Sequence, residues 1–164
     1  MLKKILVTLD GSELAEIILL HIERLASATG AEVTLLKVIT PVEIRIPTDA
    51  GHGRFLDEVV AANANSARAY LGEVAKPLRS KGVAVNIATR YGEAPDQIVD
   101  FAEEQGMDIV AMTTHGRSGL SRWIHGSVAE KVLRGASVPV LLVKATPAAL
   151  TKHLLAKHSI LSSN

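Results

Sequence analysis

The sequence predicts an α/β fold: an open, doubly wound parallel sheet of five strands in the order 3-2-1-4-5, with helices on both faces. Short apolar runs alternate along the chain with segments of helical periodicity, which is typical of repeated strand–helix–strand units. Hydrophobic residues make up 48% of the chain and aromatic residues only 3%, so Val, Ile, Leu and Ala must build the core, as in buried parallel strands. The length of 164 residues corresponds to one such domain.

Turn and capping residues separate the predicted elements. The apolar runs predict strands at residues 2–9, 32–39, 83–89, 108–113 and 139–144. Helical periodicity predicts helices at residues 12–30, 56–82, 95–106 and 127–134. Ser12 can cap the first helix, Gly30 can end it, and Pro95 can begin the third helix without the loss of a hydrogen bond. Residues 1–144 therefore form the predicted domain, followed by a tail at 145–164 that is either a helix or a frayed end.

Charge and composition exclude several classes of protein. A formal net charge of +1 gives no field that would attract nucleic acid or an anionic membrane. The absence of cysteine excludes a disulfide scaffold, a thiolate zinc site and a cysteine nucleophile, and the histidines show no spacing typical of a metal site. The apolar run before Asp10 is too short for a signal peptide or a membrane span. We therefore expect a cytoplasmic protein with no nucleic-acid or membrane partner.

The expected ligand site lies where the first and fourth strands end. In a doubly wound sheet, a ligand binds beyond the carboxyl ends of the strands at the point where the winding direction reverses. One strand ends there with Thr8, Leu9 and Asp10, and the other ends with Met112 and Thr113. The Asp10 carboxylate could accept a hydrogen bond from a ribose hydroxyl or an adenine amine. Its alternative role is an Asx turn or a helix cap.

A glycine-rich segment after the fourth strand forms the opposite wall of this site. Glu13 and Glu16 would repel phosphate near the first strand, so we expect an anion at the opposite wall. There, glycines permit close backbone approach, basic side chains supply positive charge, and a serine begins a helix. The residues concerned are His115, Gly116, Arg117, Gly119, Arg122, Gly126 and Ser127. The alternative is structural: the glycines form turns, Ser127 and Glu130 form a capping box, and His115 is exposed to solvent.

These residues resemble the nucleotide loop in the ATP-binding branch of the universal stress protein family. The pattern of that loop is Gly, two residues, Gly, nine residues, Gly, and then Ser or Thr. Gly116, Gly126 and Ser127 match its last three elements, and Thr113 stands at its first Gly. Thr8 stands where the family often has Pro. The resemblance extends over approximately residues 1–144.

The resemblance implies ATP as the ligand, with or without Mg²⁺, and a role for particular residues. Asp10 and Val38 are expected to flank the adenosine. Thr113 and Gly116 are expected to line the base and the path of the phosphates. The phosphates themselves would be held by Gly126, Ser127 and Val128.

The expected function is that of an ATP-binding sensor or switch in the stress response, with at most slow hydrolysis. Fast turnover of ATP needs a base and usually a metal held by acidic ligands, and no carboxylate besides Asp10 is evident near the loop. We therefore assign no catalytic residue. One alternative is an adenylating enzyme of the adenine nucleotide α-hydrolase type, although the sequence LDGSE lacks the Ser-Gly-Gly loop of such enzymes. The other is an interaction module without a ligand.

We also expect a homodimer, formed through the last strand at residues 138–144. In the predicted order this strand lies at an edge of the sheet, and a long apolar edge needs a cover or a partner. Pairing with a second copy would satisfy its backbone groups, as the family resemblance also implies. The alternative is that the tail folds back over the same edge through Leu150, Leu154 and Leu161.

Overall fold

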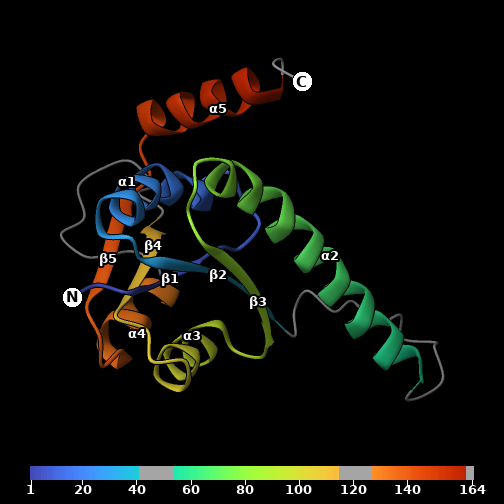
Figure 1. Cartoon of the computed structure of the whole chain (residues 1–164). Coiled ribbons are helices and arrows are strands. Elements are labelled where there is room, and N and C mark those ends of the chain that lie inside the picture. Colours follow the sequence, from blue (N-terminus) through green and yellow to red (C-terminus); the bar gives the residue numbers. More distant parts are fainter. Residues whose placement is uncertain (41–53, 115–126, 162–164) are drawn as a thin grey trace.

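The computed structural model describes residues 1–40, 54–114 and 127–161, and its centre is a five-stranded sheet (Figure 1). The strand order is β3-β2-β1-β4-β5, and every neighbouring pair is parallel. The strands are β1 (Lys4–Thr8), β2 (Glu32–Ile39), β3 (Val85–Tyr91), β4 (Ile109–Thr114) and β5 (Val140–Lys144). The predicted fold class and strand order are therefore confirmed.

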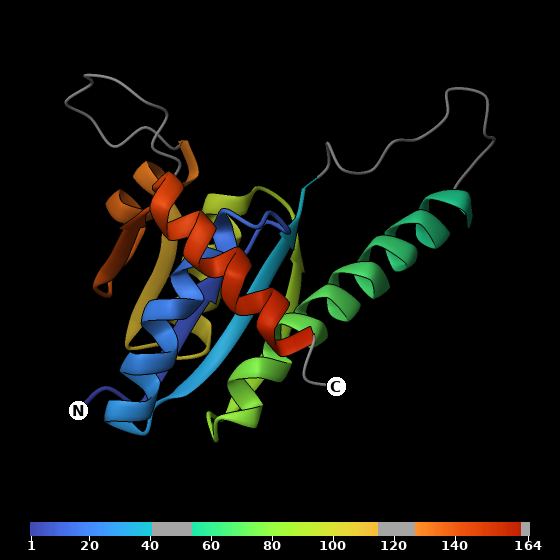
Figure 2. The same cartoon turned by 90° about the horizontal axis from the view of Figure 1, so that it is seen from above.

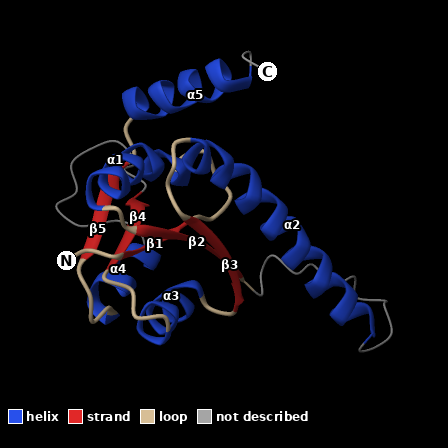
Figure 3. Cartoon of the chain, viewed as in Figure 1, coloured by secondary structure: helices blue, strands red, loops and turns tan. Residues whose placement is uncertain are grey.

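Helices cover both faces of this sheet (Figure 3). They are the 3-10 helix η1 (Ala15–Ile18) and the α-helices α1 (Leu19–Thr29), α2 (Arg54–Ser80), α3 (Ala94–Glu104), α4 (Ser127–Gly135) and α5 (Pro147–Leu161). The helices α1 and α2 pack on one face, and α3 and α4 pack on the other. The amino-terminal part of α2 extends beyond the sheet (Figure 2).

Two separate clusters of buried side chains hold the three layers together. Side chains alternate between the faces of a strand, so Ile5 and Val7 of β1 pack toward α1 and α2, while Leu6 packs toward α3 and α4. All three are fully buried. This alternation matters for the site, because it decides which β2 side chains point to the α3 and α4 face at the carboxyl edge of the sheet.

The first helical segment differs from its prediction. The helix was expected to begin at Ser12, but the α-helix begins at Leu19 and the single 3-10 turn η1 precedes it. The N-cap residue of η1 is Leu14, which makes no side-chain cap, whereas Ser12 contributes a hydrogen bond just before it: its Oγ accepts from the Ala15 N–H at 3.1 Å. The end of the helix is as predicted, because Gly30 adopts the left-handed conformation with φ of 70°.

The carboxyl-terminal tail forms the helix α5, one of its two predicted alternatives. It packs on η1 and so lies on the α1 side of the sheet (Figures 1 and 2). None of the helices in the three described ranges is both long enough and apolar enough to cross a bilayer.

Candidate functional site

A pocket of about 230 Å³ lies at the carboxyl edge of the sheet, where β1, β2 and β4 end. The winding of the sheet reverses between β1 and β4, so this is the position at which doubly wound sheets bind ligands. Its walls come from three strand ends, from η1 and from the first turns of α3 and α4. The lining residues are Thr8, Leu9, Asp10, Ala15, Leu36, Val38, Thr40, Ala94, Ile98, Met112, Thr113, Val128 and Ala129.

Most of the pocket wall is apolar. Leu36 and Val38 are two residues apart on β2, so both point to the α3 and α4 face, and Met112 of β4 belongs to the same cluster. At the first turns of α3 and α4 the lining residues are Ala94 and Ala129, whose small side chains leave room between the helices and the strands. This space suits a flat apolar group such as a nucleobase.

Asp10 is the acidic residue of the pocket, and only one of its two carboxylate oxygens has a partner in the described part of the chain. Oδ1 accepts a hydrogen bond from the Ser12 N–H at 2.8 Å, which is an Asx turn. Gly11, within the turn, has a φ of 96°. The Lys37 ammonium donates to the Asp10 carbonyl at 2.9 Å and so holds the turn against β2. The structural role expected for Asp10 is therefore real, and it leaves Oδ2 available to a ligand.

Thr113 joins β4 to the turn beside the pocket. Its hydroxyl donates a hydrogen bond to the Ala15 carbonyl at 3.1 Å, and the residue is 9% exposed. The hydroxyl is thus satisfied by the protein itself, although the side chain stands where the family pattern has glycine. The same hydrogen bond fixes Ala15, which is itself a lining residue.

The amino-terminal end of α4 forms part of the pocket wall. Val128 and Ala129 belong to the first turn of this helix and line the pocket. The first N–H groups of a helix have no partner within it, and the helix dipole places positive potential there. In the same turn, the Glu130 carboxylate accepts a hydrogen bond from Arg134 at 2.9 Å, which partly neutralises its charge. This end of the pocket can therefore accept an anion.

A model of the universal stress protein family matches residues 1–144. The chain belongs to this family. Universal stress protein MJ0577 of Methanocaldococcus jannaschii is 34% identical over 155 residues, which covers 88% of this chain and 96% of the relative. A solved structure of MJ0577 superposes with a TM-score of 0.73 at 33% identity, covering 89% of this chain and 98% of that one.

Two more distant universal stress proteins share the fold and were solved as nucleotide complexes. The protein from Archaeoglobus fulgidus in complex with dAMP has a TM-score of 0.61 and 21% identity, covering 88% of this chain and 98% of that one. The family protein from Arabidopsis thaliana with AMP bound has a TM-score of 0.63 and 15% identity, covering 89% and 94%.

Most of the binding residues expected from the sequence of this universal stress protein lie around the pocket between β1 and β4. Those lining it are Thr8, Leu9, Asp10, Val38, Met112, Thr113 and Val128. Ser127, the first residue of α4, is exposed and precedes Val128. The other four, His115, Gly116, Arg117 and Gly126, lie outside the described residues.

Sequence reasoning missed the remaining lining residues. The missed residues are Ala15, Leu36, Thr40, Ala94, Ile98 and Ala129. Leu36 could have been found, because it lies two positions before Val38 and so on the same face of β2. Thr40 follows directly after the end of this strand, two positions beyond Val38. No sequence signal indicated Ala94 or Ile98, because α3 reaches the pocket only through the packing of helix on sheet.

Proposed function

We propose that this universal stress protein binds an adenine nucleotide, ATP first, in the pocket between β1 and β4. In this proposal it acts as a sensor or switch in the stress response. The observation that carries the proposal is the composition of the pocket at the switch point of the sheet: an apolar slot, a carboxylate with one free oxygen and a helix amino terminus. The AMP and dAMP complexes of two family members support adenine as the base.

Each part of ATP has a partner of suitable chemistry in this proposal. The adenine would lie against Leu36, Val38 and Met112, where burial of apolar surface stabilises it. A ribose hydroxyl would donate to Oδ2 of Asp10, and the phosphates would extend toward the first turn of α4. The described walls enclose about 230 Å³, below the roughly 300–1,000 Å³ of typical ligand sites, so they would hold only the nucleoside end of ATP.

Hydrolysis is proposed to be slow. Among the lining residues, Asp10 is the one acidic side chain, and its Oδ1 is engaged in the Asx turn. Across the three described ranges, no group of three His, Asp or Glu side chains could hold a metal ion. A Mg²⁺ that accompanies ATP would then rest mainly on phosphate and water oxygens. We expect turnover well below the roughly 10 per second of a median enzyme.

Mass spectrometry of the small molecules released by denaturing freshly purified protein tests the binding proposal. We expect an adenine nucleotide in an amount comparable to the protein, or uptake of added ATP that survives gel filtration, with GTP as the control. Protein that carries no nucleotide and takes up none would contradict the proposal and favour an interaction module without a ligand.

We also propose a homodimer in which β5 pairs with β5 of a second copy. The Val110 N–H donates to the Pro139 carbonyl and the Ala145 N–H donates to the Thr114 carbonyl. Alternate residues of a parallel strand bond the same neighbour, so the N–H groups of Val140 and Leu142 point away from β4. These outward groups, on a strand of half-buried apolar side chains, need a partner.

Val140→Pro removes one outward N–H without removing a hydrogen bond to β4, and Leu142→Lys places a charge on the strand. Light scattering should give twice 17.4 kDa for the parent and 17.4 kDa for these variants. Leu155→Lys, at a residue of α5 that is 67% exposed, is the matched control and should remain dimeric. A parent that is monomeric at tens of micromolar would refute the dimer.

A further inference from the structure

The helix α5 is anchored to the domain through a buried carboxylate. Glu16 of η1 is only 4% exposed and accepts hydrogen bonds from three side chains. The Tyr70 hydroxyl of α2 donates to Oε1 at 3.1 Å. On α5, His153 Nε2 lies 3.0 Å from Oε2, and Lys157 Nζ lies 3.1 Å from the same oxygen. The family match ends at residue 144, so both α5 partners lie outside the matched domain.

This anchor makes the docking of α5 specific. A buried carboxylate without partners strongly destabilises the folded protein. Glu16 therefore favours the docked position of α5, in which His153 and Lys157 are its partners. Lys157 also reaches Glu13 at 3.1 Å, so one ammonium serves both acids of the segment. Burial lowers the pKa of Lys157, but hydrogen bonds and charges of Glu16 and Glu13 outweigh it and raise the pKa. Lys157 therefore stays charged.

The other side of η1 belongs to the nucleotide pocket. Ala15, the residue before Glu16, lines the pocket, and its carbonyl accepts the Thr113 hydrogen bond from β4. A 3-10 turn has poorer hydrogen-bond geometry than an α-helix, so its conformation depends more on its tertiary contacts. Four residues of η1 are thus held from two sides, by β4 at the pocket and by α5 at the surface.

We propose that docked α5 holds η1 in the conformation that completes the nucleotide pocket, so that α5 docking and ATP binding strengthen each other. This inference rests on the proposed function. When α5 is already docked, η1 is already ordered, so ATP binding loses less free energy to the ordering of η1. Linkage requires the converse as well: bound ATP must stabilise the docked helix by the same factor. His153 and Lys157 are positioning residues in this account, because they act on the pocket through Glu16.

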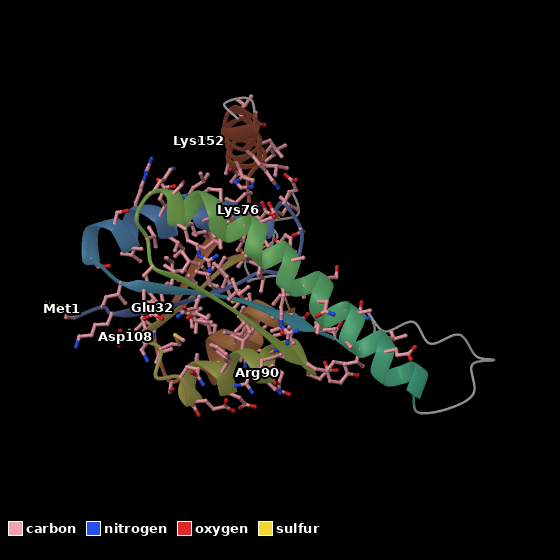
Figure 4. The ribbon with its side chains drawn as sticks, turned by 45° about the vertical axis from the view of Figure 1, so that its right-hand side comes forward. Met1, Glu32, Lys76, Arg90, Asp108 and Lys152 are labelled. Carbon is pink, nitrogen blue, oxygen red and sulfur yellow. The ribbon has the colours of Figure 1, made fainter. Side chains whose placement is uncertain are left out.

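Full-length variants test the coupling. Lys157→Ala and the double variant His153→Ala with Lys157→Ala remove α5 partners of Glu16, and His153→Gln keeps an N–H donor. Lys152→Ala, on the same helix (Figure 4), is the matched control, because Lys152 is exposed and touches none of these acids in the described contacts. Calorimetry should show ATP affinity reduced about fivefold or more in the double variant, less in Lys157→Ala, and unchanged in Lys152→Ala and His153→Gln.

Amide hydrogen exchange of α5 in the parent, with and without ATP, supplies a readout that needs no variant. We expect ATP to slow exchange over residues 147–157. Parent-like ATP affinity in the double variant, or exchange in α5 that ATP leaves unchanged, would overturn the coupling while leaving the proposed nucleotide site intact. A parent that binds no adenine nucleotide would instead overturn the proposed function and the coupling together.

Discussion

Replacement of Asp10 by alanine should weaken ATP binding by about tenfold. In the structure Oδ1 holds the Asx turn and Oδ2 is open to a ribose hydroxyl, so the variant loses the turn's hydrogen bond and, toward the ligand, one hydrogen bond to a charged acceptor. Such bonds contribute about 1.5–3 kcal/mol. Asp10 is exposed, so we take the lower end, and ~1.5 kcal/mol corresponds to about a tenfold rise in Kd.

The variant Asp10→Asn separates the ligand contact from the turn. Its amide oxygen can still accept the Ser12 N–H, so the turn is kept. The amide NH₂ that replaces Oδ2 cannot accept from the ribose hydroxyl, so the contact becomes a neutral one in which the amide donates to the hydroxyl oxygen. We expect a loss of about 0.5–1 kcal/mol, which is roughly threefold in Kd. Asp100→Ala removes an exposed carboxylate of α3 that does not line the pocket, and it serves as the control for charge.

Calorimetric titration with ATP at one fixed salt concentration measures all three variants against the parent. Thermal unfolding of each variant establishes that the fold is retained. If Asp10→Ala binds ATP as tightly as the parent while Asp100→Ala also binds normally, the assignment of Oδ2 to the nucleotide is wrong.

Three further predictions concern stability. The backbone N–H groups of Lys3 and Lys4 donate to Asp108 at 2.7 and 2.8 Å, near Met1 (Figure 4), and they lower the pKa of that carboxyl, with smaller help from the terminal amine. This stabilisation is present above the ordinary carboxyl pKa of about 4 and is lost as the pH falls through the lowered pKa. In urea titrations at successive pH values, the free energy of unfolding should therefore fall more steeply in acid for the parent than for Asp108→Asn. Thr113→Val removes the hydrogen bond to the Ala15 carbonyl of η1 and should lower the free energy of unfolding, measured in urea, by about 1 kcal/mol. An unchanged free energy of unfolding would show that this bond does not stabilise the fold. Leu71→Ala, at a fully buried position of α2, should cost about 2–5 kcal/mol in the same assay, and a cost below 1 kcal/mol would contradict the packing of this cluster.

The positions of the strands could be predicted because apolar runs are local patterns, and the doubly wound topology that alternating strands and helices favour places a pocket where β1 and β4 end. The apolar runs were sufficient to give β2 at its observed bounds, residues 32–39. The third strand begins and ends two residues later than predicted, at Val85–Tyr91. Its polar carboxyl end, with Arg90 and Tyr91, is held by pairing with Val38 and Ile39 of β2, and such pairing has no local signature.

The role of Glu16 could not be predicted from its surroundings in the sequence. Beside Glu13 in the first turn of the predicted helix, it is expected from the sequence only to repel phosphate. In the structure it is buried, and its partners on α5 are more than 130 residues away along the chain. Glu16 is buried because residues far away in the sequence pack against it. The amphipathic pattern of the local sequence contains no information on such contacts.

Photochemical cross-linking with an azido analogue of ATP, followed by peptide mapping, tests most directly that an adenine nucleotide occupies the pocket between β1 and β4. We expect labelling at the carboxyl ends of β2 and β4, around Val38 and Met112, and loss of the label when unlabelled ATP competes. The structure offers a second hollow of about 190 Å³ on the opposite face of the sheet, lined by Lys37, Ile39, Asn63, Ser66, Ala67 and Tyr70. Competed labelling of α2 around Asn63 and Ser66, with none at Val38 or Met112, would contradict the account.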